Sequence, residues 1–339
     1  MKFKSLMFVP ALGLIAGGFL AATAAGTADA RELKLAHFMP PVHHNHRNVF
    51  VPFAKEVAER SGGDLTIKIF PAGQLGPGPF DQYKRAVEGV TDIAFICHSF
   101  NPNIFRKGLL TVQMGTARTA VQATTNYYNS LELMTDEYKD VHLLAFWSVA
   151  PTIVVSRERP VRSVDDLAGA KIAIGGPAFS NVLEAWGAEA VPMGLGDIQN
   201  AVGSGIVDMV IISASILAPP WNLQDVAKHV AVGVPGLLTP CGLIMNNDVW
   251  ASLSREEKEI ITDLTGRDMA LRGAQSFDDV AQSALVNARL NPRLTVVNMG
   301  DAARQRFVDM ETPLVREVIA KMEADGVIDA QKAYDALNP

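Results

Sequence analysis

The segment VGSGIVDMVII, residues 202–212, has a counterpart in AVEGVTDIAFI at residues 86–96. In both, a helix end is followed by glycine, an apolar residue, any residue and aspartate, and then by an unbroken apolar run. Such a run is typical of a strand that is buried on both faces of a sheet. The repeat predicts that the chain builds one α/β unit twice, either in two lobes or as two units of a single domain.

Outside this repeat, short apolar runs alternate with segments of helical period, which is again the α/β pattern. Strands are expected at residues 33–38, 65–70 and 171–174, and a helix near residues 50–61 ends at two glycines. A chain of 339 residues is long enough for two domains with a large core. Length and repetition together favour two lobes.

A very long helical pattern follows Ser254. Ser254 and Glu257 form a capping box, and the helical period continues toward Asn291, with weak points at Gly266 and Gly273. This length exceeds that of an ordinary globular helix. We therefore expect an element that spans both lobes.

The N-terminus predicts a secretory signal peptide, residues 1–30. Two lysines precede an apolar run at residues 6–20, and Ala-Asp-Ala at 28–30 is the pattern at which a signal peptidase cuts. The alternative is a membrane anchor, but Pro10 and several glycines interrupt the run, which is shorter than the roughly 20 residues of a spanning helix. Cleavage after Ala30 and a periplasmic location are expected.

The composition excludes some classes of partner. The formal net charge is −6, and an acidic chain without a basic stripe lacks the surface that nucleic acid requires. No later apolar segment is long enough to cross a bilayer. The two cysteines, Cys97 and Cys241, can form a disulfide or remain buried thiols, and the sequence does not choose between these states.

The strand ends indicate where a ligand would bind, because open α/β sheets hold ligands beyond the carboxyl ends of their strands. This rule selects residues 97–101 and 213–215, and within them His98, Phe100, Ser213 and Ser215. His98 is read either as a ligand contact or as a core histidine with its hydrogen bonds satisfied. The serine hydroxyls suit a neutral or zwitterionic solute.

A series of short phrases follows in a fixed order along the chain: LKLAHF at 33–38, FPAGQLG at 70–76, RPV at 159–161, DDLAGAKI at 165–172, VPM at 191–193 and GIVD at 205–208. Through these phrases, and over its whole mature length, the chain resembles the solute receptors of tripartite ATP-independent periplasmic (TRAP) transporters. Such a receptor has two lobes that close on a small solute, which it delivers to a membrane permease driven by an ion gradient. The resemblance implies no catalysis and no cofactor, and most such receptors are monomers.

The resemblance also implies that the chain crosses between the lobes more than once. The first lobe is then expected to hold residues 31–150 and 239–280, and the second lobe residues 151–238 and 281–339. The long helix after Ser254 would run along both.

One departure from the family pattern concerns the ligand. Receptors of this kind usually carry an arginine directly after the Gly-x-Lys-Ile phrase, where it binds a substrate carboxylate through two parallel hydrogen bonds. Here that position is Ala173, and the resemblance places Phe38, Leu195 and Ile212 in the cleft as well. All four are apolar, which puts a simple organic acid in question as the ligand.

Further candidates come from aromatic, amide and imidazole side chains. Phe38, Phe100 and Trp147 could form apolar walls of the cleft, and Gln74 could supply an amide hydrogen bond. Four histidines, at positions 37, 43, 44 and 46, could be read as a metal site, but no nearby carboxylate or cysteine completes a ligand shell. We expect no metal, and choose His43 as the histidine that reaches the cleft.

Two other functional classes were weighed. An enzyme is disfavoured because the sequence has no Gly-x-Ser-x-Gly elbow, no His-Glu-x-x-His helix and no glycine-rich phosphate loop after a strand. A periplasmic sensor that binds a solute and signals to a membrane kinase is the alternative to a transport receptor.

Overall fold

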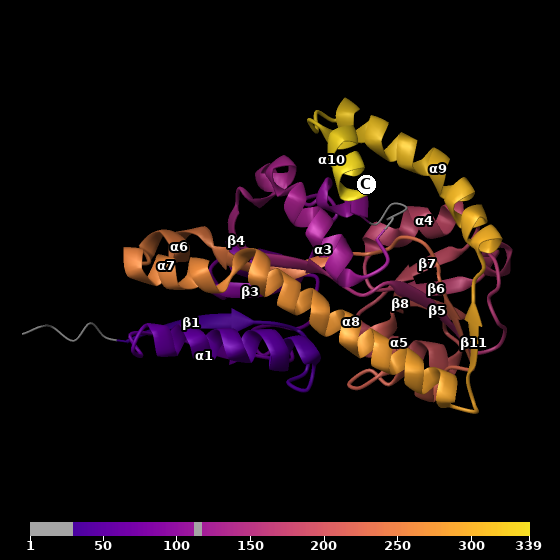
Figure 1. Ribbon diagram of the computed structural model, residues 1–339, viewed down its shortest axis with the longest axis horizontal. Helices are drawn as coiled ribbons and strands as arrows, with labels where there is room; N and C mark the ends of the chain where they lie inside the picture. The colour runs from indigo at the N-terminus through magenta and orange to yellow at the C-terminus, as the bar shows by residue number, and fades with distance from the viewer. Residues whose placement is uncertain (1–29, 112–116) are drawn as a thin grey trace, which may run out of the picture.

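The computed structural model describes residues 30–111 and 117–339, so the predicted signal peptide lies almost wholly outside the described residues. The fold contains two sheets (Figure 1). The five-stranded sheet, here called sheet A, has β10 antiparallel to both of its neighbours. Its strands, in spatial order, are β2 (Leu65–Phe70), β1 (Arg31–Ala36), β3 (Ile93–Cys97), β10 (Pro240–Asn246) and β4 (Val141–Ser148).

The six-stranded sheet, here called sheet B, has β5 antiparallel to both of its neighbours. Because each sheet takes strands from separate parts of the sequence, the chain crosses between the lobes more than once, which confirms the expected two-lobed α/β class. The strands of sheet B, in spatial order, are β11 (Thr295–Asn298), β9 (His229–Val232), β5 (Thr152–Ser156), β8 (Met209–Ser213), β6 (Lys171–Ile174) and β7 (Glu189–Pro192).

The repeated sequence unit occurs once in each sheet. It consists of α2 (Gln82–Val87) and β3 in sheet A, and of α5 (Leu195–Ser204) and β8 in sheet B. Gly89 and Gly205 follow the two helices with φ of 71° and 77°. This left-handed conformation is available to glycine without a steric penalty, so each glycine lets the chain reverse from helix to strand.

The aspartate of the unit holds the neighbouring parallel strand. The carboxylate of Asp92 accepts a hydrogen bond from the backbone N–H of Lys34 at 2.7 Å, and that of Asp208 accepts one from the N–H of Lys171 at 2.8 Å. Each aspartate also donates its own N–H to the carbonyl of the same lysine. The two sequence repeats thus mark the same strand-start contact in each lobe.

The long helical pattern is divided in the structure. The capping box of Ser254 and Glu257 is present, and it begins α7 (Arg255–Leu264). A break at Thr265 follows, with Gly266 at φ of 64°, before α8 (Gly266–Leu290). The expectation of one continuous helix from Ser254 is therefore wrong at Gly266, where the left-handed glycine interrupts the helical backbone.

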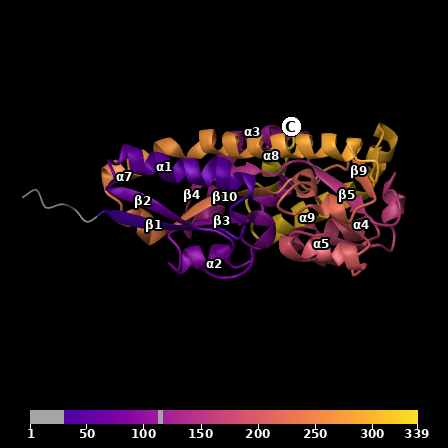
Figure 2. The same cartoon turned by 90° about the horizontal axis from the view of Figure 1, so that it is seen from below.

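Helix α8 spans both lobes, as the sequence predicted. It contacts β4 of sheet A and β11 of sheet B, and Figures 1 and 2 show it running from one lobe to the other. In Figure 2, α2 and α5 lie on the face of the molecule opposite α8. The fold also contains the helices α1 (Val51–Arg60), α3 (Ala120–Asn129), α4 (Ser180–Ala185) and α6 (Asn247–Ser252).

The C-terminal helices connect the lobes a second time. Helix α9 (Asp301–Ala324) places Phe307 in the apolar cluster of sheet B, and it places Ile319 in a cluster with residues of sheet A. Helix α10 (Ala330–Leu337) packs on α3. The division into residues 31–150 with 239–280 and residues 151–238 with 281–339 stays a proposal. In this division α10 belongs to the second lobe, although it packs on α3 of the first lobe.

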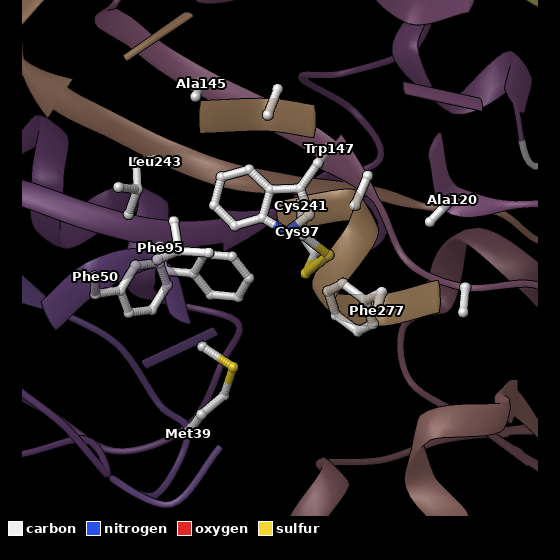
Figure 3. Packing of buried hydrophobic residues seen from close by; sticks show 14 of the residues in the cluster. Met39, Phe50, Phe95, Cys97, Ala120, Ala145, Trp147, Cys241, Leu243 and Phe277 are labelled. Atoms are coloured by element: carbon white, nitrogen blue, oxygen red, sulfur yellow. A yellow bond between two sulfur atoms is a disulfide. The ribbon is translucent and has the colours of Figure 1, made fainter. Parts of the chain in front are cut away.

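A disulfide joins the two cysteines that the sequence left open. Cys97 and Cys241 are directly opposite each other on β3 and β10, with a Cα–Cα distance of 3.9 Å. In Figure 3 the disulfide lies between the side chains of Trp147 and Phe277, with Phe95 nearby.

Among the described residues, no helix combines the length and apolar character needed to cross a membrane.

Candidate functional site

A cavity of about 90 Å³ is lined by residues of both sheets, of α8 and of the segments that cross between the sheets. This is less than the roughly 150 Å³ apolar cavity that admits benzene in an engineered protein. The cavity in this structure therefore suits a small solute. Of the eleven residues selected from the sequence, seven line the cavity: Phe38, His43, Phe100, Leu195, Ile212, Ser213 and Ser215.

The carboxyl ends of β3 and β8 both reach this cavity. Beyond β3, Ser99 and Phe100 line it, and at the end of β8 Ser213 and Ser215 do so. The hydroxyl oxygens of the two serines lie 3.1 Å apart within hydrogen-bonding distance, where Ser213 also caps a short helical turn. Their hydroxyls are therefore held next to the cavity by each other and by the backbone.

Aromatic rings form much of the wall. The ring of Phe38 lies 5.8 Å from that of Phe95 and 5.7 Å from that of Phe100, measured between centroids. Trp221 and Phe277 contribute rings from the second lobe and from α8. Such pairs stabilise each other and leave a rigid apolar surface for a solute.

The polar groups that line the cavity are uncharged. They are one imidazole, that of His43, and the hydroxyls of serine and threonine residues, and no Lys, Arg, Asp or Glu is among the lining residues that the structure describes. Thr239 is 8 % exposed, and its hydroxyl has no hydrogen-bond partner in the described part of the chain. A buried hydroxyl without a partner is costly, and a bound solute could satisfy it.

His43 is held by its own backbone segment. The side chain is 4 % exposed, and its Nδ1 accepts a hydrogen bond from the N–H of Asn45 at 3.2 Å. Burial lowers the pKa of His43 well below its usual value, and the nearby imidazoles of His44, His37 and His46 lower it further. The ring is therefore neutral at ordinary pH.

His98 does not line the cavity. It is fully buried behind β3, where its ring stacks on Phe105 at 4.2 Å and its Nε2 shares a hydrogen bond of 2.9 Å with the hydroxyl of Tyr138. Cys97 and Ser99, its sequence neighbours, line the cavity instead. His98 is thus a core histidine, as one of the two readings had it, although its Nδ1 has no hydrogen-bond partner among the described residues.

Three further predicted residues also lie away from the cavity lining. Gln74 is exposed on the loop after β2, where its side chain meets solvent. Trp147 is buried in the core under α8, and a Cβ added to Gly273 of that helix would lie 2.4 Å from its ring. Ala173 is fully buried on β6, two residues before Gly175, which does line the cavity.

Several lining residues were missed by sequence reasoning. Trp221, Phe277 and Thr239 come from a loop, from the middle of a long helix and from a segment that crosses between the sheets. None of them follows a predicted strand directly, so the strand-end rule could not select them. The Pro219–Pro220 dipeptide was the available sequence signal of a turn just before Trp221.

The two lobes touch beside the cavity. A Cβ added to Gly176, which follows β6, would lie 2.6 Å from the carbonyl oxygen of Ser99, which follows β3. Only a residue without a side chain allows this backbone approach. Glycine at position 176 therefore permits a direct backbone contact between the two lobes beside the cavity.

No group of three or more His, Cys, Asp or Glu side chains within residues 30–111 and 117–339 is arranged to hold a metal ion. In the histidine-rich segment, Nε2 of His37 and Nδ1 of His46 instead lie 2.9 Å apart as hydrogen-bond partners, and Nδ1 of His44 bonds to the hydroxyl of Ser276. These imidazoles bind one another and the protein.

Comparisons with known proteins agree with this architecture. The family description "Bacterial extracellular solute-binding protein, family 7" (DctP) matches residues 35–322. The chain is 24% identical over 326 residues to "Outer membrane transporter protein TsaT" of Comamonas testosteroni. This match covers 92% of each of the two chains.

Two solved structures share the fold. One is a TRAP solute-binding protein from a marine metagenome, specific for aromatic acid ligands, in complex with metahydroxyphenylacetate; its TM-score is 0.84 at 22% identity, covering 91% of this chain and 97% of that one. The other is a TRAP periplasmic solute-binding protein from Bordetella bronchiseptica with bound mandelate, with a TM-score of 0.82 at 23% identity, covering 91% and 98%.

The family match covers most of the chain, and the two sheets, the crossing segments and the spanning helix are those expected of such a receptor. The chain belongs to the bacterial extracellular solute-binding proteins of family 7, the TRAP receptors, which bind a small solute outside the cytoplasm and deliver it to a TRAP transporter.

Proposed function

We propose that this receptor binds a small, largely apolar solute of about one ring that carries no net negative charge. The observation that carries the proposal is the cavity lining, which combines several aromatic rings with uncharged hydroxyl and imidazole groups. An isolated carboxylate in such surroundings loses its hydration without gaining a counter-ion, which costs several kcal/mol or more. A neutral ring compound does not meet this cost.

The solved relatives support one half of this proposal and contrast with the other half. Both proteins named above hold a ring compound, metahydroxyphenylacetate or mandelate, and the aromatic walls of the cavity agree with a ring-shaped solute. Their solutes are acids, however, and Ala173 stands where TRAP receptors usually place the carboxylate-binding arginine. The proposed solute therefore shares the ring and lacks the charge.

We further propose that the protein is a monomeric, non-catalytic receptor that reaches the periplasm after cleavage at Ala30. The cavity supports the absence of catalysis, because the hydroxyls of Ser213 and Ser215 pair with each other and not with a histidine that could act as a base. The permease subunits of a TRAP transporter are the proposed partners.

A thermal-shift screen of the mature protein tests the ligand class. The library holds sugar acids, dicarboxylates, amino acids, benzoate-type acids and neutral ring compounds. Because a solute that binds only the folded state raises Tm by mass action, we expect the largest shifts from neutral one-ring compounds. Shifts confined to dicarboxylates or sugar acids would contradict the proposal.

A further inference from the structure

Within the cavity, His43 is the one imidazole that the structure describes in the lining, and its hydrogen bonds determine which of its nitrogens carries the proton. The N–H of Asn45 donates to Nδ1 at 3.2 Å, so Nδ1 must be the unprotonated nitrogen. The proton of the neutral ring is then on Nε2. Among the residues that the structure describes, the hydrogen bond of the His43 ring is the one at Nδ1, which leaves Nε2–H available to a solute.

The ring of His43 is also fixed in place from several sides. It stacks on His44 at 4.2 Å, and its edge contacts are Trp221 of the second lobe and Phe277 of α8, each at 6.3 Å between centroids. Three parts of the fold therefore meet at this imidazole. A donor whose position is set by packing can select a solute group by geometry.

The groups that face His43 leave it neutral. The titratable side chains that act on it are His44, His37 and His46 of its own segment, and all three disfavour a positive charge. The aromatic rings that the second lobe and α8 place against it are those of Trp221 and Phe277. No carboxylate among the described residues contributes to its pKa, so nothing here stabilises an imidazolium.

We propose that His43 is the specificity-determining donor of the cleft: its Nε2–H binds an acceptor oxygen of an uncharged solute, and because the ring carries no charge it offers no counter-ion to the corresponding carboxylate. This inference rests on the proposed function, since it assumes that the solute occupies the aromatic-walled cavity. A carbonyl or hydroxyl oxygen satisfies Nε2–H with one ordinary hydrogen bond. A carboxylate can accept the same hydrogen bond, but the lining supplies no cation for its charge, so its burial is costly unless a proton is taken up from solvent by the solute or by His43.

The experiment compares two probes of nearly equal shape, benzamide and benzoate, by isothermal titration at pH 7.5 and pH 5.5. Each titration is repeated in two buffers with different heats of ionisation, which reports the number of protons taken up on binding. We expect benzamide to bind at least about tenfold more tightly at pH 7.5. Benzoate should gain affinity toward pH 5.5, with uptake of close to one proton per molecule bound.

Three variants separate the role of the donor from that of the ring. His43→Phe keeps an aromatic ring and removes the donor, and should weaken benzamide binding about tenfold. His43→Gln returns an N–H donor and should recover part of that loss. His142→Gln is the matched control, because His142 lies on β4, stacks on Trp250 and does not line the cavity, and it should bind benzamide as the unaltered protein does.

The outcomes are distinct. Benzoate that binds as tightly as benzamide at pH 7.5 without proton uptake would overturn the inference, as would a His43→Phe variant with unchanged affinity for benzamide. If neither probe binds and only dicarboxylates or sugar acids raise Tm in the screen, the proposed function itself is wrong, and the inference fails with it.

Discussion

Substituting Gly176 tests how the two lobes close. A Cβ at this position would lie 2.6 Å from the carbonyl oxygen of Ser99 and 3.0 Å from its carbonyl carbon. Ordinary van der Waals contact begins at 3.4 Å, so the two backbones must separate by about 0.8 Å. Since the nearest contact is backbone and not the end of a flexible side chain, the strain is relieved only by moving the lobes apart.

The effect of Gly176→Ala should appear in binding and not in folding. Gly176 has an extended backbone with φ of −175°, which alanine adopts without strain. Overpacking costs about 1–3 kcal/mol, and here only the closed form bears this cost. The dissociation constant should therefore rise about 5- to 150-fold, while Tm of the ligand-free protein changes little.

Isothermal titration with the strongest solute from the screen measures this change. Gly196→Ala is the matched control, because Gly196 lies in α5 of the same lobe and an added Cβ there meets no atom within 4 Å. Unchanged affinity of the Gly176 variant would refute the closure argument. A loss of affinity matched by an equal loss of ligand-free stability would refute it too.

Three further predictions concern stability. Gly273→Ala should lower the free energy of unfolding by about 1–3 kcal/mol, because its Cβ would lie 2.4 Å from the Trp147 ring. A free energy of unfolding in urea equal to that of the Gly196→Ala variant would contradict this. Replacing Cys97 and Cys241 by serine should cost about 2–5 kcal/mol, since the disulfide closes a loop of 144 residues, and an unchanged urea midpoint would argue against it. Burial lowers the pKa of His44 to about 4 in the folded protein. Below pH 6.5 the unfolded chain therefore binds this proton more readily than the folded one. The contribution of neutral His44 to the free energy of unfolding is complete above pH 6.5 and is lost as the pH falls toward 4. At pH 5 the loss is about 2 kcal/mol, and His44→Gln should lose correspondingly less stability between pH 7 and pH 5 than the unaltered protein; equal losses in the two urea titrations would count against this account.

The fold was predictable because its signals are local. The glycine of each repeated unit and the aspartate three residues later fix a helix end and a strand start by hydrogen bonds to a neighbouring strand, as Asp92 and Asp208 do. The capping box at Ser254 likewise depends on a side chain three residues away. At Gly266 the local signal was ambiguous. The sequence showed only a residue of low helix propensity there, and in the structure the helix is interrupted at this position.

The cavity was harder to predict because its lining depends on contacts between distant segments. The strand-end rule selected the correct short segments, but it did not tell which side chain of each segment faces the cavity. Thus Ser99 lines the cavity while His98 is buried behind the strand. Trp221 and Phe277 enter from a loop and from a spanning helix, and no periodicity in the sequence shows where such elements meet.

The most direct test of the account is a crystal structure of the mature protein with the strongest solute from the screen. The account predicts an uncharged ring packed against Phe38 and Trp221, with an oxygen atom at hydrogen-bonding distance, about 3 Å, from Nε2 of His43. A bound carboxylate paired with a lysine or arginine, or a solute that lies outside this cavity, would contradict it.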